Sequence, residues 1–114
     1  MSKPPREFTV AELALVERLL LLAGLDTPER LNEVRHAQVR EMDDGGMGSL
    51  RTIGEDDRKM GGVIADAVAR DLDDILVYFS LIVDKDNRLF ELDVWKVDFS
   101  PLKAIPSPDA LRPA

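Results

Sequence analysis

Residues 75–83 read ILVYFSLIV, and this stretch decides the fold class. Successive side chains of a β-strand point to opposite faces of the sheet. Here every second residue is a large apolar one, which gives one uninterrupted apolar face: Ile75, Val77, Phe79, Leu81 and Val83. The other face is mixed, since it carries Tyr78 and Ser80 beside aliphatic residues. A strand with this pattern is typical of a sheet centre, so we expect a central strand over 75–84.

Four further segments alternate with a period of two, at 37–42, 48–54, 61–70 and 88–97. Short polar links join neighbouring segments, which favours antiparallel pairing of consecutive strands. The alanine-rich segment 61–70 is also compatible with a helix. It runs directly into the turn-like residues 71–74, however, which favours a long hairpin arm. The sequence therefore predicts a five-stranded antiparallel β-meander.

The N-terminal part carries the signals of two helices. Thr9 and Glu12 have the spacing of a capping box, in which each side chain bonds the backbone N–H of the other residue. Gly24 is typical of a helix stop, and Pro28 opens a second, short helix that we expect to end near Arg35. Two N-terminal helices packed on an antiparallel sheet give an α+β fold.

A length of 114 residues is typical of one domain. We expect this α+β domain to span 1–102. Four of the seven prolines lie from position 101 onward, and proline interrupts regular helices and strands. Residues 103–114 are therefore expected to form an extended C-terminal tail.

The composition excludes several classes of function. With 15 basic and 22 acidic residues the net charge is −7, which opposes sequence-independent binding to nucleic acid or to an anionic membrane and favours a basic protein partner. The absence of cysteine excludes disulfides, thiol nucleophiles and thiolate metal sites. The start has no signal-peptide core and the longest apolar run, 19–23, is too short to cross a bilayer, so we expect a cytoplasmic protein without a cofactor.

The segment 43–50, DDGGMGSL, has three glycines within four positions. A phosphate-binding Walker loop would need a lysine and a following helix, but this segment has no lysine and runs into a strand-like stretch. The dinucleotide-binding pattern also fails, because Arg51 stands where a third glycine belongs. The pattern favours a glycine turn between two strands, with Met47 exposed at its tip. A ligand loop is the less favoured alternative.

The segment 90–99, FELDVWKVDF, places acids and the single tryptophan together. Alternation puts Phe90, Leu92 and Val94 on one face and Glu91, Asp93 and Trp95 on the other. The spacing of the two acids permits acid/base chemistry without arguing for it, because acids on the open face of a sheet are usually solvated. A tryptophan among charges fits a binding surface better. The following residues 99–102, Phe-Ser-Pro-Leu, are interpreted as a structural strand end.

Together the two segments resemble a family of small bacterial proteins catalogued as a domain of unknown function. In that family a GGMGS-type loop precedes a strand and an ELDxWKxDFSPL stretch closes the domain. The resemblance covers roughly 8–102, and the matching residues are 44–50 and 91–102. It implies no activity, but it favours one shared patch made of Asp44, Gly45, Gly46, Met47, Gly48, Ser49, Glu91, Asp93, Trp95 and Lys96.

The leading hypothesis is a non-catalytic interaction module that binds a basic macromolecule through an acidic, tryptophan-bearing sheet face. By analogy alone, a small acidic cysteine-free protein of this kind resembles the immunity proteins of bacterial toxin systems. The rival hypothesis is a small metal-assisted enzyme with oxygen ligands at Asp43, Asp44, Glu91 and Asp93.

Two further alternatives stay open at this point. A small molecule could bind in a cleft between the helices and the sheet. Leu21, on the polar side of the first helix, leaves a homodimer open. His36 is the only histidine, so the usual zinc site and a catalytic triad lack sequence support.

Overall fold

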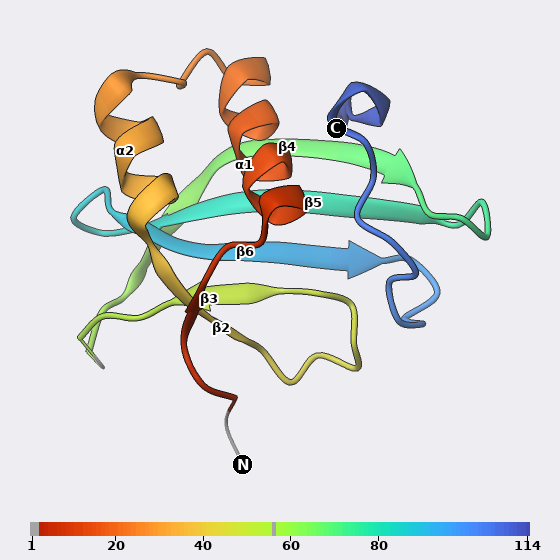
Figure 1. The fold of residues 1–114 in the computed structure, drawn as a ribbon, viewed down its shortest axis with the longest axis horizontal. Coiled ribbons are helices and arrows are strands. Elements are labelled where there is room, and N and C mark those ends of the chain that lie inside the picture. The colour runs from red at the N-terminus through yellow and green to blue at the C-terminus, as the bar shows by residue number, and fades with distance from the viewer. Residues whose placement is uncertain (1–2, 56) are drawn as a thin grey trace.

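The computed structural model describes residues 3–55 and 57–114 (Figure 1). Within these ranges there are two α-helices, α1 (Val10–Leu22) and α2 (Pro28–His36), and one short 3₁₀-helix, η1 (Pro108–Ala110). Seven strands form one antiparallel sheet in the order β1-β2-β3-β6-β5-β4-β7. The strands are β1 (Arg6–Glu7), β2 (Gln38–Glu41), β3 (Leu50–Thr52), β4 (Met60–Arg70), β5 (Leu76–Asp84), β6 (Leu89–Lys96) and β7 (Arg112–Pro113).

The α+β class is confirmed, but the expected five-stranded meander is wrong in the number and order of its strands. β6 pairs with β5 on one side and with β3 on the other, where Leu50 is the Cα partner of Leu92. β3 and β4 are therefore not neighbours, although they are consecutive in sequence. A meander would have left β6 at the sheet edge. The observed order gives its buried Leu92 and Val94 a strand on either side, and two-residue strands form the edges instead.

Both helices begin as the sequence predicts. The Thr9 hydroxyl accepts a hydrogen bond from the Glu12 N–H, and the Glu12 carboxylate accepts one from the Thr9 N–H. Gly24 ends α1 with φ of +71°, and the next N–H, that of Leu25, donates back to the carbonyl of Leu20. No helix within the described ranges is long and apolar enough to cross a membrane.

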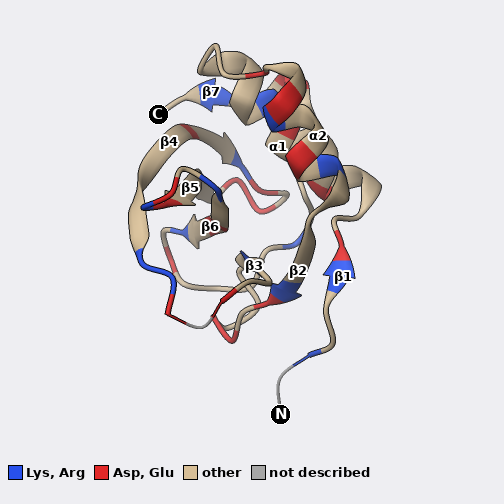
Figure 2. Cartoon of the chain, turned by 90° about the vertical axis from the view of Figure 1, so that its left-hand side faces the viewer, with Lys and Arg blue, Asp and Glu red and all other residues tan. Residues whose placement is uncertain are grey.

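Viewed from the side, the strands follow a strongly curved line and both helices lie on the same side of it (Figure 2). We call the side that faces the helices the inner face and the opposite side the outer face. Apolar residues of α1, α2 and the inner face, together with Leu111 of the C-terminal segment, form the core: Leu15, Val16, Leu19, Leu20, Val34, Val39, Leu50, Ala65, Ala67, Ala69, Val77, Phe79, Leu81, Leu89, Leu92, Val94 and Leu111. The helices leave the outer face uncovered.

The expectation that Phe90 shares a face with Leu92 and Val94 is wrong. Phe90 is the extra residue of a β-bulge between the cross-strand pairs Val83↔Leu89 and Ile82↔Glu91. Its ring lies outside the core and against two guanidinium groups, whose central carbons are 4.9 Å (Arg51) and 5.0 Å (Arg58) from the ring centroid. The bulge shifts the alternation, which periodicity in one strand does not reveal.

The C-terminal segment 103–114 is more ordered than the expected extended tail. The N–H groups of Lys103 and Ala104 donate to the carboxylate of Asp71, and Leu111 is buried in the core. Its last residues form η1 and then β7, which pairs with β4. Despite its prolines, the segment packs on the rest of the protein, although η1 and β7 are short.

Candidate functional site

The glycine loop is a turn whose backbone N–H groups donate hydrogen bonds to the carboxylate of Asp44, a residue of the same loop. One carboxylate oxygen of Asp44 accepts a hydrogen bond from the Met47 N–H (3.2 Å), and the other accepts one from the Ser49 N–H (2.9 Å). All three loop glycines have positive φ, a conformation that other residues adopt at a cost. The loop joins β2 to β3, so the interpretation as a glycine turn is correct. Met47 is half-buried rather than exposed.

The glycine loop and the closing strand β6 lie side by side. The Ser49 hydroxyl, buried between them, accepts from the Val94 N–H (2.9 Å) and donates to the Val94 carbonyl (3.3 Å). The Leu102 N–H donates to the Gly46 carbonyl (3.0 Å). Gly46 also packs on Pro101, because a Cβ at position 46 would lie 3.2 Å from the Pro101 Cβ. The two segments that the sequence singles out thus form one unit.

Residues 5–106 match the family described as a domain of unknown function, DUF6984. The chain belongs to this family. No curated protein and no solved structure matches it. Since the description of DUF6984 names no activity, the chemistry of the chain's own surfaces has to indicate a function.

Lys96 does not lie in the expected surface patch of this DUF6984 domain. It follows Trp95 directly and therefore points to the opposite face, where it is fully buried. Its ammonium donates to Asp71 (2.8 Å), to Asp73 (2.6 Å) and to the Pro101 carbonyl (3.2 Å). This buried ion pair joins the end of β6 to the turn between β4 and β5 and to the start of the C-terminal segment.

The surroundings of Asp71 keep it ionised. Burial alone would raise the pKa of this carboxyl, but hydrogen bonds from the Lys96 ammonium and from the backbone N–H groups of Lys103 and Leu72 outweigh burial. The pKa of Asp71 is therefore lowered to about 2. The pKa of Lys96 is raised, because its bonds to Asp71 and Asp73 outweigh the opposing effect of burial. Lys96 thus has a structural role.

The outer face carries three aromatic side chains, of which Trp95 and Phe99 are exposed and Tyr78 is half-buried. Trp95 is the cross-strand partner of Tyr78, and the two rings stack with centroids 5.6 Å apart and an interplanar angle of 27°. The ring of Phe99 packs edge-on against the ring of Trp95, with centroids 6.2 Å apart. Trp95 is 42% exposed and Phe99 is 68% exposed. We call Tyr78, Trp95 and Phe99 the aromatic row.

Phe99 is a second aromatic residue, besides Phe90, whose place the sequence pattern assigned wrongly. It is not a buried anchor, and its φ is +63°, in the left-handed region that side chains other than glycine rarely adopt. The turn is nevertheless well bonded, because the Phe99 N–H donates to the Lys96 carbonyl and Asp98 accepts from Ser100. The chain therefore holds a large apolar ring at the surface in an unfavourable backbone conformation.

Beside the aromatic row lies a row of acids. Asp93 is the cross-strand partner of Ser80, which is in turn the partner of Asp66, so all three share the outer face. We call Asp66 and Asp93 the acidic row. Within the described residues Asp93 forms no hydrogen bond or ion pair through its side chain, and the burial of its carboxyl together with the charges of Glu91 and Asp44 raises its pKa.

Asp93 differs in this respect from the other shifted acids. In the part of the chain that the structure describes, every other carboxyl with a shifted pKa has it lowered by hydrogen bonds or nearby cations: Glu12, Asp71, Asp73, Asp84 and Asp98. The surroundings of Asp93 instead disfavour its charge. An acid that the fold leaves without a partner beside an exposed tryptophan is a candidate for binding.

Two of the other acids that the sequence singled out, Glu91 and Asp44, already accept hydrogen bonds within the chain. Glu91 accepts two hydrogen bonds from Arg51, at 2.7 and 3.1 Å, and Asp44 holds the glycine loop. Asp43 is exposed on the same loop. Among the described residues no three or more acidic, histidine or cysteine side chains are arranged to hold a metal ion. Asp43, Asp44, Glu91 and Asp93, the ligands of the rival hypothesis, accordingly do not form such a group.

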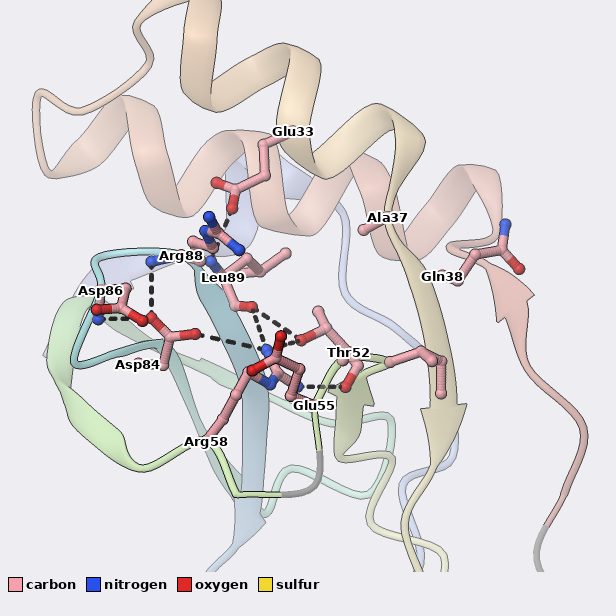
Figure 3. A pocket seen from close by; sticks show the side chains of 12 residues that line it. Glu33, Ala37, Gln38, Thr52, Glu55, Arg58, Asp84, Asp86, Arg88 and Leu89 are labelled. Carbon is pink, nitrogen blue, oxygen red and sulfur yellow. Dashed lines mark hydrogen bonds and ion pairs between the residues drawn. The ribbon is translucent and has the colours of Figure 1, made fainter.

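A second candidate site is a pocket of about 280 Å³ between the end of α2, the start of β2, the end of β3 and the turn between β5 and β6 (Figure 3). Arg58 reaches across it and donates to the carbonyls of Thr52 (2.7 Å) and Leu89 (3.3 Å). Asp84 lies 3.6 Å from the same guanidinium, and Glu33 accepts from the Leu89 N–H. Most polar groups of the pocket therefore bond its walls to one another.

Two buried atoms in this region, Arg58 Nε and Asp84 Oδ2, have no hydrogen-bond partner among the described residues. Arg58 was not singled out from the sequence, because the partners of this side chain are 6 and 31 residues away.

Proposed function

We propose that this DUF6984 domain is a non-catalytic protein-interaction module whose binding surface consists of the aromatic row and the acidic row. The observation that carries the proposal is the exposed Trp95–Phe99 pair, with Phe99 held at positive φ. A left-handed conformation costs roughly 1–2 kcal/mol for a residue other than glycine. Strained residues of this kind cluster at functional sites.

The other residues of the two segments have structural explanations. Asp44 and Ser49 hold the loop, Lys96 forms the buried ion pair, and Pro101 packs on Gly46. No structural explanation of this kind accounts for Asp93, Trp95 and Phe99. Exposed aromatic side chains next to polar groups are the usual anchors of protein interfaces, since they offer a large rigid contact area.

Charge argues for a basic partner. The acidic row lies next to the aromatic row on a chain whose net charge is −7, so the surface attracts positive groups and repels nucleic acid and anionic lipid. The same repulsion disfavours a second copy of this chain at the same face, because two acidic rows would then meet. We therefore favour a different, basic protein over a homodimer at this surface.

The test is capture of the partner followed by quantitative binding. The tagged chain is recovered from its native host after crosslinking, the captured protein is identified and purified, and its affinity is measured by calorimetry. Trp95→Ala and Phe99→Ala should each weaken binding by about tenfold or more, as expected for interface anchors. Val10→Ala is the matched control, because Val10 is an exposed apolar residue on the helical side of the protein.

Full affinity in both Trp95→Ala and Phe99→Ala would refute the proposed surface. Equal weakening by Val10→Ala would show that the loss is not specific to the aromatic row.

A further inference from the structure

Asp93 and Trp95 are two residues apart on β6 and share the outer face. Residues at this spacing on a strand lie about 6.5–7 Å apart along the backbone, a distance that one long side chain can bridge. We propose that the partner of this surface presents an arginine side chain whose guanidinium stacks on Trp95 and donates hydrogen bonds to the carboxylate of Asp93. This inference rests on the proposed function and specifies the chemistry of the partner.

A related combination exists within the chain at the bulge of β6, where the ring and the acid belong to adjacent residues. Arg51 lies over the ring of Phe90, 4.9 Å from its centroid, and donates through Nε and a terminal nitrogen to Glu91. One arginine there contacts both the aromatic ring and the acid of the same strand. Asp93 and Trp95 repeat the combination of acid and ring without the arginine.

The sheet itself explains why the arginine is missing at Asp93. Glu91 receives Arg51 because the two residues are cross-strand partners of β6 and β3. β3 begins at Leu50, and the preceding residue, Ser49, is bonded to the backbone of Val94. β3 therefore supplies no cation to Asp93, and β5 presents Ser80 as its other neighbour. Among the residues that the structure describes, no cation is bonded to this carboxylate, so the position is open to a cation from a partner.

The aromatic side of the site suits a guanidinium. Tyr78 and Phe99 contact Trp95 and hold its ring in place, while 42% of the residue is exposed. Tryptophan attracts cations over its ring more strongly than the other aromatic residues. Asp66, on the far side of Ser80, adds a second carboxylate to the same surface.

Arginine fits this site better than lysine. A planar guanidinium can stack on an indole and offer two parallel N–H donors to one carboxylate at the same time. A lysine ammonium is a compact, strongly hydrated charge that cannot do both with the same geometry. The site should therefore bind a planar guanidinium more tightly than an ammonium group of the same charge.

The test uses three blocked tripeptides, with arginine, lysine or citrulline at both ends and glycine between them. Trp95 is the only tryptophan of the chain, so its fluorescence reports directly on this site. At low ionic strength the arginine peptide should bind with a dissociation constant on the order of 1 mM or tighter, and about fivefold more tightly than the lysine peptide. The neutral citrulline peptide should not saturate the signal.

Asp93→Asn should lower the affinity for the arginine peptide about fivefold or more, and it keeps Trp95 as the fluorescent reporter. Asp26→Asn removes the same charge from the exposed link between α1 and α2, and it should leave the affinity unchanged. Unfolding curves of both variants show that they are folded. Asp93 has no stabilising bond to lose, so the substitution should be tolerated.

Equal affinity for the arginine and lysine peptides would overturn the inference, as would unchanged binding in Asp93→Asn or no binding to the wild-type chain. None of these results bears on the aromatic row as an interface. The proposed function fails instead if the captured partner binds Trp95→Ala and Phe99→Ala as tightly as it binds the wild type.

Discussion

Trp95 and Lys96 are consecutive residues of β6 that lie on opposite faces of the sheet. Trp95 is 42% exposed among aromatic and acidic neighbours, whereas Lys96 is fully buried and bonded to Asp71 and Asp73. The side-chain alternation of one strand thus divides the closing segment into residues that hold the fold together and residues exposed on the outer face. The two groups should respond to substitution in opposite ways.

Lys96→Met should strongly destabilise the fold. The substitution leaves the buried carboxylate of Asp71 without its cation, and removing one member of a buried ion pair is strongly destabilising. The melting temperature should fall on the order of ten degrees for a domain of this size. Lys85→Met, on the exposed turn between β5 and β6, is the control and should change it little. Similar melting of both variants in calorimetry would contradict the structural role.

The contribution of this ion pair should depend on pH in the acid range. The folded pKa of Asp71 is about 2, below its ordinary value of 3.8, so the folded state binds this proton less readily than the unfolded state. The stabilisation is therefore fully present above pH 3.8 and is lost as the pH falls toward 2. Denaturant unfolding of the wild type and Lys96→Met at several pH values measures the difference, which should shrink below about pH 3.8. A constant difference down to pH 2 would refute this assignment.

Local patterns predicted the parts of the fold that depend on neighbours in sequence. The capping box at Thr9 and the stop at Gly24 are set within a few residues, and each has the expected form. The turn at Asp74 likewise uses positive φ in place of the more usual glycine. The strand order was not predictable in this way, because pairing of β3 with β6 joins residues 40 apart.

The candidate site shows the same limit. Sequence motifs placed Asp93 and Trp95 on one face correctly, since both depend on alternation in one strand. They could not show that Lys96 finds its acids on the turn between β4 and β5, or that Tyr78 stacks on Trp95 from the neighbouring strand. Phe99 was misjudged because its exposure follows from a tight turn after β6.

Asp93→Asn should stabilise the free protein at neutral pH. The folded pKa of Asp93 is raised by burial and by the charges of Glu91 and Asp44, so ionisation of this carboxyl opposes folding above its folded pKa. Removing the charge should therefore raise the melting temperature at pH 7. The gain should disappear in acid, where Asp93 is protonated in the wild type. Asp26→Asn controls for net charge, and a lower melting temperature for Asp93→Asn than for this control would contradict the prediction.

Ser49→Ala should separate the glycine loop from β6. The hydroxyl is the acceptor for the Val94 N–H, and its removal leaves a buried donor without a partner. The free energy of unfolding should fall by about 1–3 kcal/mol. Ser107→Ala is the matched control, because the exposed Ser107 side chain makes no capping bond to η1. Equal stability of the two variants in urea unfolding would show that the loop is held mainly by Asp44.

Phe99→Gly should leave the fold at least as stable as the wild type and still remove the ring from the binding surface. Glycine adopts positive φ without steric cost, and this gain offsets the lost edge contact with Trp95. Phe99→Ala loses the same contact but keeps the strain, so it should be less stable than Phe99→Gly by about 1 kcal/mol. Urea unfolding of the three proteins tests the order directly. If Phe99→Gly is as destabilised as Phe99→Ala, the ring contributes to folding, and the strain at position 99 no longer points to a role in binding.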